Sequence, residues 1–106
     1  MIMSTNWQTK AAEFAQKRNH KHPISVYALD LMSEVGEVAK EILLATNYGE
    51  EELELATTNM QMELGDALYS LCLLATAADV DLDAALTAVL EKYEKRWAEK
   101  GDMGSE

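Results

Sequence analysis

The chain has 106 residues, 48% of them apolar and 26% charged, and a formal net charge of −10. That length fits a single domain, 1–106, and that composition excludes a disordered chain. The acidic balance excludes a non-specific nucleic-acid binder, because phosphate backbones are bound by clustered lysine and arginine.

The expected compartment follows from the same inventory. No segment is long and apolar enough to span a bilayer, and the first residues have no signal-peptide pattern. The single cysteine, Cys72, lies in an apolar helical run and has no second cysteine to pair with. We therefore expect a cytoplasmic protein that binds no membrane and in which Cys72 is a buried, inert thiol.

The first expected helix covers about residues 5–19. Apolar residues recur at helical spacing from Trp7 onwards, and Thr5 with Gln8 can form a capping box. The helix must end before Pro23, because proline disfavours helix in the residue before it.

The second expected helix covers about residues 24–46 and stops at Asn47-Tyr48-Gly49, since glycine and asparagine are typical of helix C-termini. At about 100° per residue, four acids of this helix fall in a strip about 60° wide that borders the apolar arc. A merely solvated charge run would more often lie opposite the core. The four acids are Asp30, Glu34, Glu37 and Glu41.

The third expected helix covers about residues 53–78, and the acidic run before it suits a helix N-terminus. The fourth covers about residues 82–100, with Asp81 as its N-cap and Gly101 as its C-cap. Four helices and no alternating strand pattern predict an all-α, four-helix bundle-like fold. A core this thin also favours self-association.

Two tetrapeptides with the same pattern lie inside the second and third helices, Glu-Val-Gly-Glu at 34–37 and Glu-Leu-Gly-Asp at 63–66. Residues three apart share a helix face, so each pair directs two carboxylates the same way, where they repel one another. The glycines, Gly36 and Gly65, weaken a helix interior and suggest the close approach of a backbone or ligand. We expect four carboxylates to bind divalent metal together. They are Glu34, Glu37, Glu63 and Asp66.

Carboxylates without histidine suit hard cations, so Mg²⁺ is the expected metal and Mn²⁺ is possible. No histidine follows His22, which argues against a redox di-iron site of the Glu-x-x-His type. Magnesium held by carboxylates commonly serves phosphate chemistry, in which Glu37 or Glu41 could take a proton from the attacking water. Lys92 and Arg96, one turn apart, either bind the phosphates or cover the edge of the core.

Three further residues are candidates for substrate binding. Trp7 and Tyr69 are either core residues or surfaces on which a base stacks. His20 lies in a loop with Lys21 and His22 and is either solvated or at the border of a ligand pocket.

The segments 28–39, 63–68 and 92–97 resemble the MazG-type nucleoside triphosphate pyrophosphohydrolases of the all-α NTP pyrophosphatase superfamily. The resemblance covers about Ala28 to Lys100. It implies an all-α homodimer or homotetramer that hydrolyses a nucleoside triphosphate to the monophosphate and pyrophosphate. It also implies that Glu34, Glu37, Glu63 and Asp66 bind Mg²⁺, with Lys92 and Arg96 near the phosphates. The alternative is a non-catalytic helical module whose acids bind structural metal or a basic partner.

Overall fold

The computed structural model describes residues 6–55 and 58–101 of the chain, which form four α-helices and no strand. The helices are α1 (Asn6–Lys17), α2 (Ile24–Ala45), α3 (Met60–Ala77) and α4 (Leu82–Lys100). The expected all-α fold is confirmed. Within the described residues, no helix combines the length and the apolarity that a membrane crossing requires.

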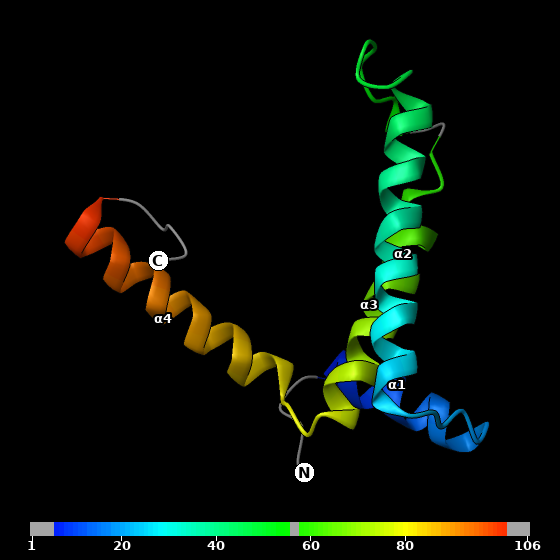
Figure 1. Ribbon diagram of the computed structural model, residues 1–106, viewed down its shortest axis with the longest axis vertical. Helices are drawn as coiled ribbons and strands as arrows, with labels where there is room; N and C mark the ends of the chain where they lie inside the picture. Colours follow the sequence, from blue (N-terminus) through cyan, green and yellow to red (C-terminus); the bar gives the residue numbers. More distant parts are fainter. Residues whose placement is uncertain (1–5, 56–57, 102–106) are drawn as a thin grey trace.

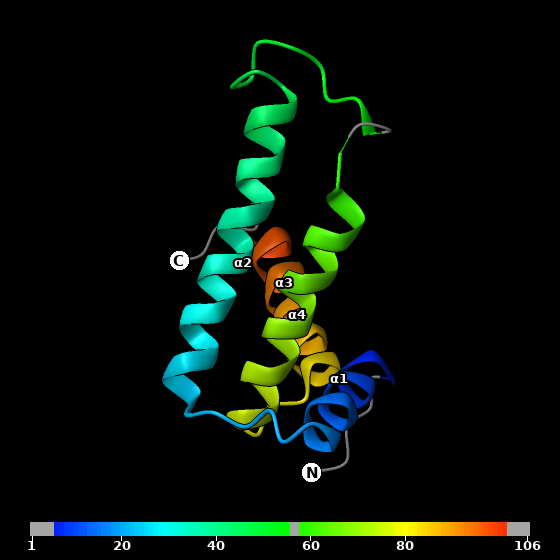
Figure 2. The same ribbon diagram turned by 90° about the vertical axis from the view of Figure 1, so that its right-hand side faces the viewer.

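Helices α2 and α3 lie side by side and run in opposite directions, and α1 packs across the lower part of α3 (Figures 1 and 2). A small core lies where the three helices meet. It contains Ala15, Tyr27 and Leu73, with Tyr69 and Leu74 packed against it. The contacts of this core therefore hold α1, α2 and α3 together at this end of the molecule.

The loop between α1 and α2 is fastened by a buried tyrosine. The Tyr27 hydroxyl donates to the carbonyl of His20 at 3.1 Å and accepts from the backbone N–H of His22 at 2.9 Å. A buried hydroxyl with both roles satisfied is stable, so the 18–23 loop is held against the core.

The helix ends follow local sequence signals at most positions. Asn47, Tyr48 and Gly49 have positive φ angles of 50°, 58° and 89°, and they stop α2 where the sequence indicates. Asp81 caps α4, accepting from the backbone N–H of Asp83 at 3.0 Å. Gly101 ends α4 in the left-handed region with φ of 76°. Thr5, the other half of the expected capping box, lies outside the described residues.

The expected start of the third helix is wrong, because α3 begins at Met60 and not near residue 53. The Glu41 carboxylate on α2 accepts from the backbone N–H of Asn59 at 3.0 Å. The carbonyl of Asn59 in turn accepts from the backbone N–H of Glu63, and this bond begins the helical hydrogen bonding of α3. A contact from the neighbouring helix thus selects the first turn, which the acidic run at 50–54 could not reveal.

Helix α4 is the element that departs most from a closed bundle. It leaves the end of α3 and projects away from the other three helices (Figure 1). Its apolar stripe is consequently open, with Leu90 at 54% and Trp97 at 60% exposure. The sequence pattern correctly predicts the stripe, but the described residues of this chain leave it exposed.

Candidate functional site

Three carboxylates converge between α2 and α3. Glu34 on α2 and Glu63 and Asp66 on α3 each offer one oxygen, and the three oxygens lie within 4.8 Å of one another. Glu34 and Glu63 are half-buried and Asp66 is exposed. Three carboxylate oxygens at this spacing form a set of ligands suited to a hard divalent cation.

Helical periodicity places these acids. Glu34 shares a face of α2 with Tyr27 and Val38, which turn toward α3, so its side chain enters the seam between the helices. Glu63 shares a face of α3 with the buried Ser70. The packing of α2 on α3 therefore forces acids of like charge together, as the two sequence motifs predict.

Burial and the neighbouring acids change the pKa of the Glu34 carboxyl. Partial desolvation, followed by the negative charges of Asp66, Glu63, Glu37 and Asp30, raises the pKa of the Glu34 carboxyl above its ordinary value. The native state therefore binds this proton more tightly than the unfolded chain does. Its contribution to stability is present at low pH and is lost as pH rises through the raised native pKa.

We expect the substitution Glu34→Gln to raise the melting temperature of the metal-free protein near neutral pH by a few degrees, because it removes the repelled charge. The measurement is thermal unfolding in EDTA over a series of pH values, and the gain should shrink toward acid pH. Glu13→Gln, which removes an exposed acid of α1, is the control and should change little. A variant that is less stable than the parent throughout would contradict the crowding.

The other two acids expected at the site have different positions. Glu37 is exposed and lies outside the convergent group of three, although its charge acts on Glu34. The Glu41 carboxylate accepts a hydrogen bond from the backbone N–H of Asn59 and so has a structural role at the start of α3. Of the four acids expected to bind metal, three therefore converge, while Glu37 lies farther round α2 from the seam and its metal-binding role stays a prediction. The catalytic roles of Glu37 and Glu41 stay predictions.

An aromatic cavity of about 450 Å³ adjoins the acids between α1 and α3. It brings together Trp7 and Tyr69, two residues singled out from the sequence, with Asp66 at its border. Phe14 meets the ring of Tyr69 edge-on, at 5.9 Å between centroids. The cavity is lined by Trp7, Lys10, Ala11, Phe14, Gly65, Asp66, Leu68, Tyr69 and Cys72.

Lys10 and Phe14 are cavity residues that the sequence reasoning missed. They lie three and seven residues after Trp7, which puts all three on one face of α1. That spacing is the signal that could have identified them. The bottom of the cavity includes Cys72, which is buried as expected, and burial raises the pKa of its thiol.

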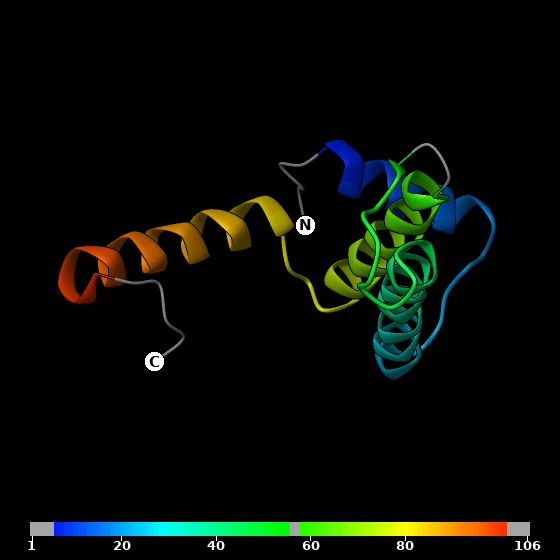
Figure 3. The same ribbon diagram turned by 90° about the horizontal axis from the view of Figure 1, so that it is seen from above.

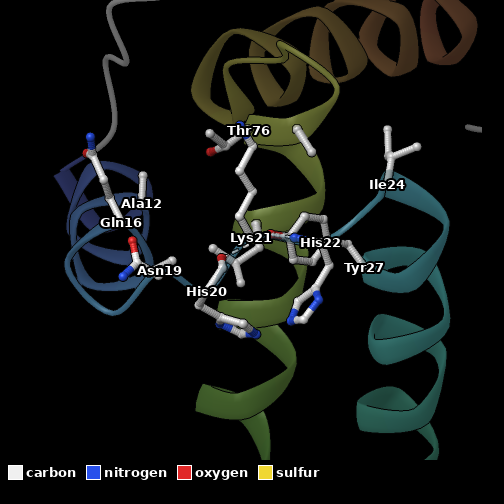
Figure 4. A pocket seen from close by; sticks show the side chains of 12 residues that line it. Ala12, Gln16, Asn19, His20, Lys21, His22, Ile24, Tyr27 and Thr76 are labelled. Carbon is white, nitrogen blue, oxygen red and sulfur yellow. Dashed lines mark hydrogen bonds between the residues drawn. The ribbon is translucent and has the colours of Figure 1, made fainter.

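A second cavity, of about 560 Å³, lies under the 18–23 loop near the end of α3. Figure 4 shows His20 and His22 between α1 and α2, with Gln16 and Asn19 on the α1 side and Ile24 and Tyr27 on the α2 side. The loop therefore borders a cavity, which agrees with the interpretation that places His20 at the edge of a pocket. None of the described residues that line this cavity is acidic, whereas the three convergent carboxylates lie in the seam between α2 and α3.

His20 nonetheless reaches the aromatic cavity through Tyr69. Its Nδ1 lies 3.1 Å from the Tyr69 hydroxyl, and the two rings are nearly parallel, with an interplanar angle of 16°. Partial burial raises the pKa of Tyr69, so its hydroxyl stays protonated and available for this bond. His20 thus positions one wall of the aromatic cavity.

Lys92 and Arg96 lie on α4 and therefore away from the convergent acids on α2 and α3 (Figure 1). Lys92 rests near the ring of Tyr93, with its Nζ 5.3 Å from the ring centroid. A phosphate-binding role for the two cations stays a prediction, and within one chain the fold does not bring them to the cluster.

The expectation of a close backbone neighbour at the two helix glycines is wrong within this chain. Apart from its chain neighbours and the nearby backbone of its own helix, no heavy atom of the described residues lies within 4 Å of a Cβ at Gly36 or at Gly65. Gly65 instead lines the aromatic cavity beside Asp66, and Gly36 lies on an exposed part of α2. The open space at Gly65 leaves room for a ligand.

Comparison with known proteins agrees with this geometry. Residues 22–99 match the family described as MazG nucleotide pyrophosphohydrolase domain. The chain is also similar to the "Uncharacterized protein YpjD" of Bacillus subtilis, with 31% identity over 90 residues, or 79% of this chain and 78% of that protein. No solved structure matches the chain. The matched region contains α2, α3 and α4 with all three convergent acids.

Proposed function

Because the chain belongs to the MazG nucleotide pyrophosphohydrolase family, we propose that it hydrolyses a nucleoside triphosphate to a nucleoside monophosphate and pyrophosphate. The observation that carries the proposal is the convergence of Glu34, Glu63 and Asp66 within 4.8 Å. Acids this close destabilise one another unless a cation or a proton lies between them. A site of this kind suits a substrate that arrives with a dication on its phosphates.

The three carboxylates hold Mg²⁺, or Mn²⁺ in its place, and each has a role set by its position. Glu34 and Glu63, half-buried in the seam, fix the metal to the fold, while Asp66 is exposed toward the aromatic cavity. A dication held there would neutralise phosphate charge and lower the pKa of water at the site. Glu37, exposed one turn from Glu34, is placed to accept a proton from that water.

The nucleobase occupies the aromatic cavity between α1 and α3. Trp7, Phe14 and Tyr69 offer flat apolar surfaces, and Asp66 at the border links the cavity to the carboxylate cluster. Base stacking on aromatic rings contributes about 1–3 kcal/mol per base and tolerates different bases. The proposal thus assigns one substrate to two adjoining features, phosphates at the acids and base at the rings.

The test is turnover of canonical, deoxy and modified nucleoside triphosphates with Mg²⁺, followed by release of pyrophosphate. We expect at least one to turn over, and Glu63→Gln to lower kcat/KM by roughly 10²–10³-fold through loss of one ligand. Glu91→Gln on α4 removes an equal charge outside the site and serves as control. Release of orthophosphate alone, or full activity of Glu63→Gln, would refute the proposal.

We expect Trp7→Ala to raise KM about tenfold with little change in kcat, since stacking holds the base equally in the ground and transition states. Trp7→Phe, which keeps a flat ring, should recover most of the loss. Tyr48→Ala removes an exposed ring from a loop outside the cavity and is the matched control. An unchanged KM in Trp7→Ala would place the base elsewhere.

A further inference from the structure

Both histidines of the chain lie in one loop and line one cavity. The chain contains two histidines, His20 and His22, and both border the cavity of about 560 Å³ under the 18–23 loop. Their imidazole rings are 4.9 Å apart between centroids, with an angle of 81° between the ring planes. Figure 4 shows the two rings as neighbours at one end of this cavity. Nucleotide hydrolysis as proposed above leaves His22 without a role.

The distance between the rings is that of two imidazoles on one metal ion. Zinc lies about 2.0–2.1 Å from each ligating imidazole nitrogen in a tetrahedral site, which separates the centroids of two such rings by about 5 Å. The observed separation is 4.9 Å, and the rings are not stacked. Imidazole nitrogen is a preferred ligand of Zn²⁺, Ni²⁺ and Cu²⁺, whereas Mg²⁺ prefers oxygen. The histidine pair therefore suits a different class of ion from the convergent carboxylates.

The two histidines are held in place by the fold itself. The Tyr27 hydroxyl bonds both the carbonyl of His20 and the backbone N–H of His22, so it spans the residue between them. The backbone N–H of His20 donates to the carbonyl of Ala15 at 2.8 Å and ties the loop to α1. A site that is already ordered loses little conformational entropy when a ligand binds.

The Tyr69 hydroxyl gives His20 the kind of hydrogen-bond partner that metal-bound imidazoles have. It lies 3.1 Å from Nδ1 of His20, and the roles in this bond depend on the tautomer. When Nδ1 carries the proton and donates to Tyr69, Nε2 keeps its lone pair for a metal ion. Among the described residues, no hydrogen bond engages Nε2 of His20 or the ring of His22.

Charge and access also favour a cation at these rings. The chain has a formal net charge of −10, which raises the local concentration of cations. Lys21 directs its side chain toward the Thr76 end of the cavity and away from both rings (Figure 4). Seen from above, the 18–23 loop lies on the side of the α2–α3 pair opposite α4, so α4 does not cover it (Figure 3). His22 is exposed, and an ion from solvent can reach it.

We propose that His20 and His22 bind one divalent transition-metal ion that prefers nitrogen ligands, of the Zn²⁺, Ni²⁺ or Cu²⁺ class, at a site distinct from the convergent carboxylates. Nε2 of His20 and one ring nitrogen of His22 are the protein ligands, and water completes the coordination. An ion bound there would fix His20 as the donor to Tyr69, and so would join the loop to one wall of the aromatic cavity. The site does not depend on nucleotide hydrolysis, so binding alone tests it.

The NMR signals of the imidazole rings report this site directly, because the chain has only two histidines. Zn²⁺ is added to the untagged whole chain in the presence of excess Mg²⁺, which competes for the carboxylates. We expect the ring signals of both histidines to change together and to reach completion at one Zn²⁺ per chain. If the ring of either histidine does not respond to excess Zn²⁺, the proposal is overturned.

The ligands are tested by measuring zinc affinity in competition with a chromophoric chelator. His22→Gln keeps the backbone N–H that donates to Tyr27, so the loop keeps its anchor, and we expect it to bind Zn²⁺ about 100-fold more weakly. Lys21→Ala alters the same loop without removing a ligand and should bind as tightly as the parent. Equal affinity in His22→Gln and the parent overturns the proposal.

Tyr69→Phe tests the positioning of His20, because it removes the hydroxyl and keeps the ring. We expect zinc affinity to fall about tenfold, the effect of losing the hydrogen-bond partner of a metal-bound imidazole. The ring signals of both histidines should still respond at higher Zn²⁺ concentration. An affinity equal to that of the parent would remove Tyr69 from the site.

Glu63→Gln separates the histidine site from the carboxylates. It removes one convergent carboxylate, so it should weaken Mg²⁺ binding and leave the response of both histidines to Zn²⁺ unchanged. Loss of that response in Glu63→Gln would place the zinc ion at the carboxylates and overturn the proposal. A parent that turns over no nucleotide, but in which both rings respond to Zn²⁺, refutes the proposed function and leaves the histidine site standing.

Discussion

Asp66→Asn is expected to abolish the rise in melting temperature that Mg²⁺ produces in the parent protein. A ligand bound only by the native state at about 100 times its dissociation constant stabilises the fold by about 2.7 kcal/mol. For a chain of this size that corresponds to a rise of about 10 °C or more. Asp66 offers one of the three convergent oxygens, and an amide in its place removes the charge that holds the cation. The measurement is thermal unfolding with and without Mg²⁺.

Asp30→Asn provides the matched control, because it removes one negative charge from the same acidic strip without removing a convergent oxygen. It should keep most of the Mg²⁺-dependent rise. In parallel, Asp66→Asn should lower nucleotide turnover by roughly 10²–10³-fold, the loss expected when charge stabilisation worth several kcal/mol is removed. An Mg²⁺ shift of the same size in Asp66→Asn and in the parent would exclude Asp66 from the metal site.

The helix positions could be predicted where the signal is local. Asp81 and Gly101 bound α4 as expected, and the positive φ angles at Asn47 and Gly49 stop α2 in the expected place. The start of α3 could not be predicted, because a carboxylate eighteen residues earlier, that of Glu41, selects it. Local propensity favours helix in the acidic run, but a tertiary contact decides where the ladder begins.

The candidate site could also be predicted in part. Pairs of acids three residues apart on two helices indicate a common negatively charged site, and three of the four acids do converge. Which of them enter the seam depends on the rotation of α2 against α3, which fixes Glu34 inside and Glu37 outside. Spacing within one helix carries no information about that rotation.

The position of α4 is the feature that the sequence could not reveal. Its apolar stripe has the period of a core-facing helix, and that period is the same whether the cover comes from its own chain or from another. Whether α4 packs on its own chain depends on the turn at 79–82. There Asp79 has a positive φ of 59°, and the chain direction changes before α4 begins. The direction of one short connection thus separates a closed bundle from an arrangement in which α4 projects away from the other helices.

A buried side chain of α1 helps to hold that turn. Gln8, on α1, has no exposed surface and makes contacts with both sides of the turn. Its Nε2 donates to the carbonyl of Val80 at 2.8 Å and to Thr76 Oγ1 at 3.4 Å, and its Oε1 accepts from the N–H of Leu82 at 2.8 Å. The sequence suggested a capping role for Gln8, but all the polar atoms of its side chain are engaged with the α3–α4 turn.

Gln8→Ala is therefore expected to lower the free energy of unfolding by about 2–4 kcal/mol, because it leaves a buried carbonyl and a buried N–H without their partner. Urea denaturation followed by circular dichroism measures the change. Gln16→Ala, an exposed glutamine on the same helix, should cost under about 0.5 kcal/mol. A Gln8→Ala protein as stable as Gln16→Ala would mean that the turn holds its shape without Gln8, and α4 would then be directed by its own cap at Asp81 alone.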